Sequence, residues 1–371
     1  MDTLFLAYLR NYKGFMENFR ETGTGGTIAT FNALANTQVK NLKIGIEAVQ
    51  SGSGDPSPDN VRPITGWTQA KVTRCGKNLF SASTATLMDN VVLNRDTGLV
   101  ASESNMASLY IRCQPNTTYT ISRTKHSATW RFNAGYTKEL PAVGISVYGF
   151  PNILYPSVDA DGRGSITITT GADAKYLFVY LCWKTMETIA DAESDLQIEV
   201  SPNVTPYEPY NSTTYTIDLD GTVYGGTLDV TKGELTVTTK MIDMGAMVWS
   251  KAIDGGFSTP LTGAPVGLNL LIISSIFKYD DSFSFAWNKF DSAPDNTLFR
   301  NSGNNNLYCK CTSATTEEAF STICEGQKLV FELATPQTFA VTPKQIFALE
   351  GANNMWADTG DIISFDYYGE S

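Results

Sequence analysis

The residues best suited to hold a ligand are aromatic and lie in the run YLFVYLCW. Because side chains alternate along a strand, Tyr176, Phe178 and Tyr180 share one face and the residues between them share the other. Sugars stack their C–H faces on such rings in shallow grooves. The three rings are therefore a candidate carbohydrate-binding ladder. The competing interpretation, which we favour on general grounds, is that one face fills a sandwich interior and the other contacts a neighbouring subunit.

A second aromatic group lies in TWRFNAGY, where Trp130, Phe132 and Tyr136 share one face. Trp130 and Tyr136 are further candidates for carbohydrate binding by the same chemistry. Burial in a hydrophobic core is the favoured interpretation of this group.

A pair of carboxylates could catalyse hydrolysis of a glycosidic bond, since glycan-degrading enzymes use two acids and need no histidine. IDLDG places Asp218 and Asp220 on one face of a strand, but Asp-Gly at a strand end is first a turn signal. Asp159 and Asp161 begin like a calcium loop and lack the later ligands, so a turn is favoured there too. We predict no catalytic residue, no metal site and no cofactor.

Histidine and cysteine chemistry is scarce. His126 is the one histidine, which leaves little room for zinc clusters or histidine-activated nucleophiles. The six cysteines match no metal-binding spacing, and Cys309 and Cys311 stand one residue apart on a predicted strand. Free, partly buried thiols are the expectation, and the composition favours a protein that is not an enzyme.

The charge balance argues against two classes of partner. The chain has 371 residues, with 27 basic against 38 acidic side chains and a formal charge of −11, so nucleic acid and anionic membranes are disfavoured. No apolar run of about 18 residues occurs that could cross a bilayer, so no membrane insertion is expected.

The first twenty residues carry the clearest helical period. Phe5, Tyr8, Tyr12, Phe15 and Phe19 step by three and four, which predicts a helix over residues 1–22 with an aromatic seam. A stripe this short cannot hold an isolated coiled coil, so it must pack on its own downstream domain or on a partner chain. The seam is thus a candidate for oligomerisation or anchoring.

The elements that position these residues are strands. After the helix, the pattern predicts a small β unit with a Pro/Gly-rich loop over 23–75, a jelly-roll sandwich over 76–210 and a C-terminal β domain over 211–371. One short helix is predicted at TPKQIFALEG, residues 342–351, from its capping box and terminal glycine. The expected fold class is mainly β, with several antiparallel sandwiches of jelly-roll type and a short N-terminal helix.

Several segments of the sequence resemble segments of known proteins. They are IEAVQSGSGDPSPDNVRPITGW followed by GKNLF, NTTYTISR with FNAGYT, SITITTGADAKYLFVYL, LQIEVSPNVTPYEPY and FELATPQTFAVTPKQIFALEGANNMWADTGDI. Together they span roughly residues 27 to 367 and resemble baseplate, tail-tip and fibre proteins of tailed bacteriophages and prophages of Gram-positive bacteria. The resemblance implies a virion protein assembled in the host cytoplasm, commonly a homotrimer, with a jelly-roll module similar to carbohydrate-binding modules.

The expected function is therefore non-enzymatic attachment of a virion to host-surface polysaccharide through the jelly roll. A capsid decoration or head-fibre protein is the first alternative, because it shares modules and composition. A glycan hydrolase is the second, and it requires Asp218 and Asp220 to lie in a cleft.

Overall fold

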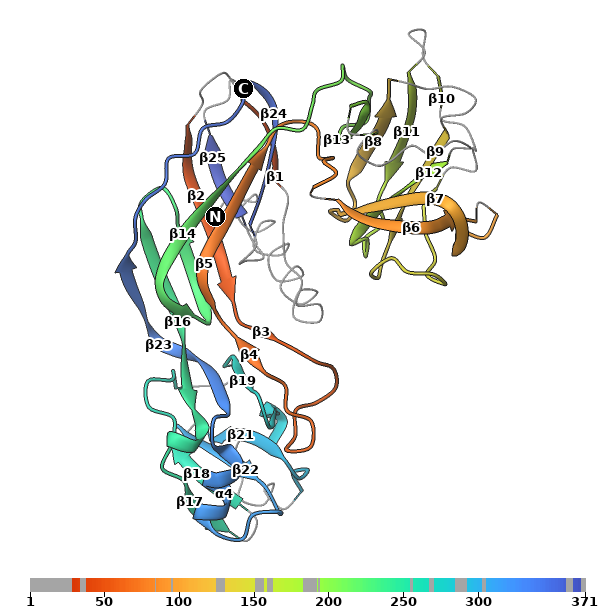
Figure 1. The fold of residues 1–371 in the computed structure, drawn as a ribbon. Helices are drawn as coiled ribbons and strands as arrows, with labels where there is room; N and C mark the ends of the chain where they lie inside the picture. Colours follow the sequence, from red (N-terminus) through yellow and green to blue (C-terminus); the bar gives the residue numbers. More distant parts are fainter. Residues whose placement is uncertain are drawn as a thin grey trace.

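The computed structural model describes most of the chain downstream of residue 28. The described ranges are 29–33, 38–83, 85–94, 96–124, 131–150, 157–158, 163–182, 192, 194–253, 256–266, 270–283, 292–301, 305–357 and 363–367. The helix predicted over residues 1–22, with its seam Phe5, Tyr8, Tyr12, Phe15 and Phe19, and the ring of Trp130 lie outside these ranges. Within them strands dominate and nearly all pairs are antiparallel, which confirms the predicted mainly β sandwich architecture (Figure 1).

A central sandwich of two sheets forms the middle of the molecule. One sheet has the order β1 (Ala29–Ala33), β24 (Gly351–Ala357), β5 (Trp67–Cys75) and β14 (Ser212–Val223). The other has the order β19 (Ile272–Ser274), β23 (Lys328–Ala340), β16 (Glu234–Asp243), β15 (Gly225–Asp229), β2 (Val39–Glu47) and β25 (Ile363–Tyr367). Strand β2 alternates between the two faces of its sheet: Leu42, Ile44 and Ile46 are buried in the core between the sheets, while Lys43 is exposed.

The jelly roll is inserted into this sandwich rather than following it. Strand β5 ends at Cys75 and β14 begins at Ser212, and these two residues are paired directly with each other. The chain thus leaves for the jelly roll and returns at one point of one sheet. Residues 23–75 consequently do not form a separate unit, since β2 pairs with β15 and β25, and β5 pairs with β14 and β24.

A second insertion splits the predicted C-terminal domain 211–371. Asp243 at the end of β16 pairs with Lys328 at the start of β23, and most of the chain between them builds a lower unit with its own core. That unit contains the sheet β17 (Ser250–Ile253), β18 (Gly256–Pro260), β22 (Asn306–Lys310), β21 (Thr297–Asn301) and β20 (Lys278–Tyr279), with the 3₁₀ turns η1 (Met244–Ala246) and η2 (Asp281–Phe283). Both units are therefore inserted between paired strands of the central sandwich. The jelly roll lies between β5 and β14, and the lower unit lies between β16 and β23.

The helix of the lower unit is α4 (Glu317–Cys324), which the sequence reasoning missed. The Thr316 side chain caps it by accepting a hydrogen bond from the Ala319 amide, and Phe320 packs face to face on Phe257 with 4.2 Å between ring centroids. The signal in the sequence was a capping threonine followed by two glutamates and apolar residues four apart.

The helix predicted at residues 342–351 is wrong. The Lys344 amide donates to the Val230 carbonyl at 3.1 Å, and the Ile346 carbonyl accepts from the Val39 amide at 3.0 Å. Ile346 is buried in the central core. Because these backbone groups bond to the central sheet, the segment stays extended despite its helical capping signals.

The jelly roll itself consists of two four-stranded sheets. Their orders are β6 (Thr86–Leu93), β7 (Val100–Arg112), β12 (Tyr176–Cys182), β9 (Arg131–Thr137), and β10 (Ser157–Val158), β11 (Gly164–Thr169), β8 (Thr118–Arg123), β13 (Leu196–Val200). Apart from the hairpins β6–β7 and β10–β11, neighbouring strands are not consecutive in the sequence, as in the double Greek key of a jelly roll. Side chains from both sheets share one core, which includes Ile121, Ile168, Leu177 and Val179.

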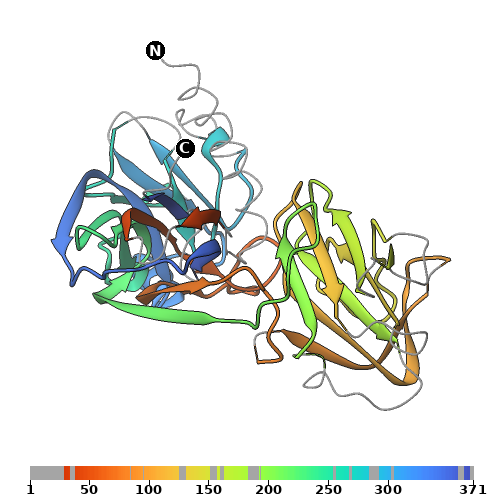
Figure 2. The ribbon, with the colours of Figure 1, turned by 90° about the horizontal axis from the view of Figure 1, so that it is seen from above.

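The jelly roll stands beside the central sandwich and is fastened to it at the insertion point (Figures 1 and 2). The Asn354 side chain donates to the Gly76 carbonyl at 2.9 Å, and Trp356 packs against the cores of both units. Next in the chain, Lys77 donates to the Pro206 carbonyl, while the Asn78 amide group bonds to the Leu196 and Glu208 carbonyls. The GKNLF segment therefore clamps the entering and leaving strands together.

The Pro/Gly-rich loop is an ordered connection between units. It closes the short hairpin of β3 (Val49–Gln50) and β4 (Ile64–Thr65), and the Arg62 guanidinium donates to the carbonyls of Ser51, Gly52 and Gly54. Asp55 in the loop forms an ion pair with Lys278 of the lower unit at 3.0 Å. The loop therefore contacts the lower unit through this exposed ion pair.

Candidate functional site

The outer face of the sheet β6-β7-β12-β9, the face turned away from the jelly-roll core, contains the predicted ring ladder. Phe178 has no exposed surface and Tyr180 is 8% exposed. Both belong to a second, smaller core with Val91, Leu93 and Val147. A ring that is covered in this way cannot stack on a sugar, so Phe178 and Tyr180 are corrected from ligand contacts to core residues.

A cover segment, residues 138–150, lies over that face. The Gly144 amide donates to the Val100 carbonyl at 2.8 Å, and the Val147 amide donates to the Gly98 carbonyl at 2.7 Å. These bonds hold the segment along the start of β7, and Val147 reaches the small core beneath it. The segment therefore supplies the burial that an isolated sheet face would lack.

Gly135 on β9 allows this close approach. A Cβ atom there would lie 2.3 Å from Val147 Cγ1 and 2.7 Å from the Tyr148 carbonyl oxygen, which is closer than real Cβ contacts. The residue faces the cover segment because it pairs with Phe178.

We predict that Gly135→Ala lifts the cover segment from the sheet. Overpacking of this kind costs about 1–3 kcal/mol of folding free energy. Faster hydrogen exchange in residues 138–150 and in β12 would show the effect. Gly76→Ala is the matched control, because a Cβ atom there meets nothing closer than Leu349 Cδ1 at 3.4 Å. Unchanged exchange in the Gly135 variant would contradict the prediction.

The remaining predicted rings lie apart from one another. Tyr176 is half-buried and packs edge to face on Tyr110, with centroids 5.5 Å apart. Tyr136 is half-buried and lies 6.0 Å from the exposed ring of Tyr148. Trp130 is outside the described residues, and Phe132 is buried in the main jelly-roll core. The structure therefore does not assemble the predicted aromatic residues into one surface.

A cation accompanies the Tyr136 and Tyr148 pair. The Lys138 ammonium lies 4.9 Å from the centroid of the Tyr148 ring and 2.5 Å from an Asp173 carboxylate oxygen. The hydrogen bond between the two charges raises the pKa of Lys138 and lowers that of Asp173. Because Lys138 lies over Tyr148, this corner of the jelly roll does not present two free ring faces.

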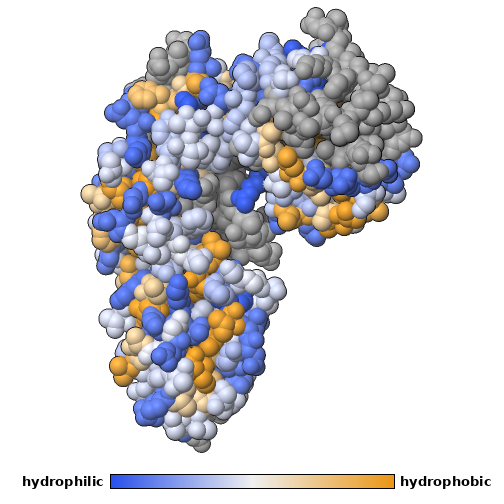
Figure 3. All heavy atoms as spheres, viewed as in Figure 1, coloured by the Kyte–Doolittle hydropathy of each residue, from blue (hydrophilic) through white to orange (hydrophobic). Residues whose placement is uncertain are grey.

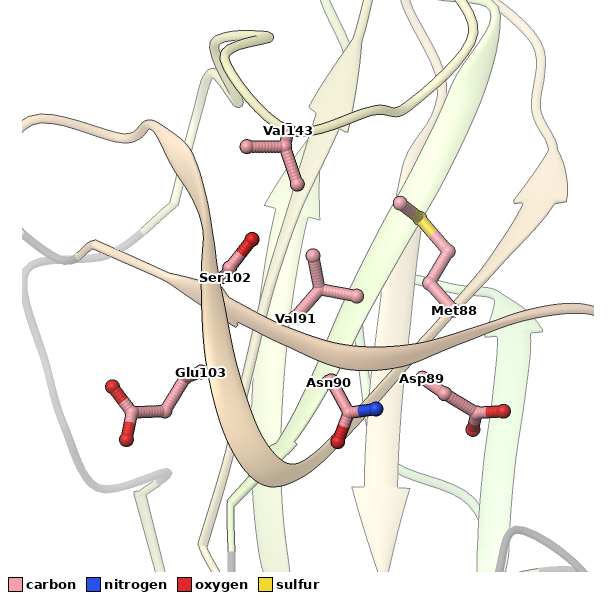
Figure 4. Close-up of a pocket in the computed structure, with 7 residues that line it drawn as sticks. All are labelled: Met88, Asp89, Asn90, Val91, Ser102, Glu103 and Val143. Carbon is pink, nitrogen blue, oxygen red and sulfur yellow. The ribbon is translucent and has the colours of Figure 1, made fainter.

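A hollow lies at an irregularity between β6 and β7. The pairing jumps from Asp89 with Ala107 to Val91 with Ser102, so one residue on β6 faces four on β7. Asn90 takes a left-handed φ of 54° at this point. Such bulges bend the strands and re-aim side chains. Here they open a pocket of about 600 Å³, lined by Met88, Asp89, Asn90, Val91, Ser102, Glu103 and Val143 (Figure 4).

The pocket has an apolar side and a polar side. Val91 and Met88 point toward Val143 of the cover segment, while Asp89, Asn90 and Glu103 point the other way (Figure 4). The carboxylates of Asp89 and Glu103 point away from each other. An arrangement of this kind can pack against the apolar face of a ligand and accept hydrogen bonds along its edge.

The sequence reasoning did not select these pocket residues. The available signal was the run TLMDNVVL, in which two adjacent polar residues interrupt an apolar strand. Two adjacent polar residues break the strict alternation of a strand with one buried face. The four unpaired residues on β7 could not be read from the sequence, because they depend on the register between two strands.

The predicted carboxylate pair lies elsewhere, on the central sandwich. Asp218 and Asp220 are both exposed on β14, where its pairing with β5 becomes irregular, and the Asp218 carboxylate accepts a hydrogen bond from the Asp220 amide at 2.9 Å. Asp220 has a φ of 54° and Gly221 follows, so the pair serves a turn. Neither residue lines the pocket.

The cysteines with described side chains are free thiols. Burial raises the pKa of the Cys75 and Cys113 thiols to about 12, and it raises that of Cys309 well above the ordinary value. A thiol with so high a pKa is a poor nucleophile.

In the part of the chain that the structure describes, no cluster of three or more histidine, cysteine or acidic side chains is placed to hold a metal ion. Over the same residues, no helix is long and apolar enough to span a bilayer.

No protein-family model, curated protein or solved structure matches this chain.

Proposed function

We propose that the protein is a structural component of a tailed-bacteriophage virion, at the tail tip, baseplate or fibre, and that its jelly roll attaches the particle to host-surface polysaccharide. The observation that carries this proposal is the pocket between β6, β7 and the cover segment, on a module that projects from the central sandwich. The resemblance of the sequence to phage tail proteins supports the setting.

Exposed apolar side chains accompany the pocket. Leu87, Leu99, Leu140 and Val143 are between 40% and 59% exposed, and all belong to β6, the turn before β7 or the cover segment. Figure 3 shows apolar surface gathered on this underside of the jelly roll. Contiguous apolar surface rimmed by polar residues is typical of binding surfaces.

Binding is favoured over hydrolysis by the direction of the acids. A glycosidase holds its two carboxyl groups on either side of one bond. The carboxylates of Asp89 and Glu103 point away from each other, and Asp218 and Asp220 form a turn on another unit. These four acids therefore lend no geometric support to the hydrolase alternative.

We expect purified protein to retain host envelope polysaccharide without shortening it, and Val143→Gln to weaken retention about tenfold or more, because a neutral amide would replace an apolar pocket wall. Val143 is 59% exposed, so the fold tolerates the change. Val248→Gln is the control, since Val248 is 81% exposed and lies in the lower unit. Shortened chains would instead indicate a hydrolase, and equal retention by both variants would refute binding at this pocket.

The proposed setting includes a homotrimer with other virion proteins as neighbours. In this setting, the aromatic seam of the helix predicted over residues 1–22 anchors the protein or holds the trimer together. A head-fibre or capsid-decoration role is the alternative location, and labelling of intact particles with antibody distinguishes head from tail.

A further inference from the structure

The polar edge of the pocket is rich in hydrogen-bond acceptors. Asp89 and Glu103 are exposed carboxylates that can only accept, whereas Asn90 and Ser102 can both donate and accept. None of the seven lining residues is basic. The best complement to this edge is a ligand with more donors than acceptors.

The negative charge of the pocket further restricts the chemical class of its ligand. Two carboxylates on one small pocket repel uronic acids and phosphate-bearing polymers, and the chain as a whole carries −11. A neutral sugar supplies hydroxyl donors but gains no attraction between opposite charges. An ammonium supplies three donors and forms charge-assisted hydrogen bonds, which are the stronger kind.

We infer that the pocket recognises a glycan that carries free amino groups, such as a polymer of unacetylated hexosamine; this inference rests on the proposed attachment function. The apolar face of a sugar ring lies on Met88, Val91 and Val143. Ammonium groups lie along the opposite edge, beside Asp89 and Glu103. Because these two acids point to opposite ends of the edge, successive amino sugars along one chain can each meet a carboxylate.

The test uses the full chain and two oligomers of equal length, glucosamine and N-acetylglucosamine, measured by calorimetry at about pH 6, where an amine is protonated. We expect the glucosamine oligomer to bind at least about tenfold more tightly. Added salt should weaken that binding, because the contact lies at an exposed edge. An oligomer of galacturonic acid should not bind.

Substitutions test whether the preference for the glucosamine oligomer depends on the two pocket acids. Asp89→Asn and Glu103→Gln keep the shape of each side chain and remove its charge, so each should reduce the preference for the glucosamine oligomer, and the double variant should abolish it. Glu139→Gln is the matched control, because Glu139 is an exposed acid of the cover segment that does not line the pocket.

The outcomes separate this inference from the proposed function. Equal affinity for the two oligomers, no binding of either, or full preference in the double variant overturns the inference, even if host polysaccharide is retained. Preference that depends on both acids, without retention of any host polysaccharide, supports the inference on pocket specificity and overturns the proposed attachment role.

Discussion

Replacing Arg123 by methionine is expected to unfold the jelly roll while the central sandwich stays folded. Arg123 and Asp195 have no exposed surface, and the guanidinium donates two hydrogen bonds to the carboxylate, at 3.1 and 2.8 Å. Removal of one partner leaves a buried charge without its counterion. That costs about 3–5 kcal/mol, which is a large share of the stability of one domain.

Hydrogen exchange of the full chain measures this result unit by unit. The amides of β8 and β13 should lose protection, and those of β15 and β16 should keep it. The double variant Arg123→Met with Asp195→Leu should recover much of the loss, because neither charge of this buried pair then remains. Arg112→Met, at an exposed position on β7, is the control for loss of an arginine. Full protection of the jelly roll in the single variant would show that the pair does not hold it.

Deleting residues 77–210 and joining Gly76 to Asn211 through Asn-Gly should leave the central sandwich folded and abolish retention of polysaccharide. The Gly76 amide donates to the Asn211 carbonyl at 2.9 Å, so the ends of the gap are already paired. Asn-Gly closes two-residue hairpins of this kind. The loss of binding should be complete because the whole proposed site is removed.

The deletion leaves Trp356 and Cys75 without their jelly-roll contacts. A moderate fall in the melting temperature is therefore expected, together with a cooperative transition and strand-rich circular dichroism. The full chain carrying Val143→Gln serves as the comparison, since its retention should weaken with its jelly roll intact. Loss of cooperative unfolding after the deletion would show that the sandwich depends on the inserted unit.

The sequence predicted the strands well where one face meets a core and the other meets water. Leu42, Ile44 and Ile46 alternate with exposed or half-exposed neighbours, and β2 shows this burial pattern. Local signals were less reliable where tertiary bonds competed. No helix forms after Thr342, because backbone groups of that segment bond to β2 and to the turn after β15. The cap at Thr316, by contrast, starts α4.

The sequence by itself determined a mainly β protein, a jelly-roll segment between residues 76 and 210, and which side chains along β12 share a face. These properties depend on alternation and turn residues, which are local. The tertiary structure alone decided that Cys75 meets Ser212 and Asp243 meets Lys328, so that two units grow from one sandwich. It also decided that residues 138–150 cover Phe178 and Tyr180, and that a register shift beside Asn90 opens the pocket. Alternation says that a strand has two faces, but only long-range pairing determines what lies against each face.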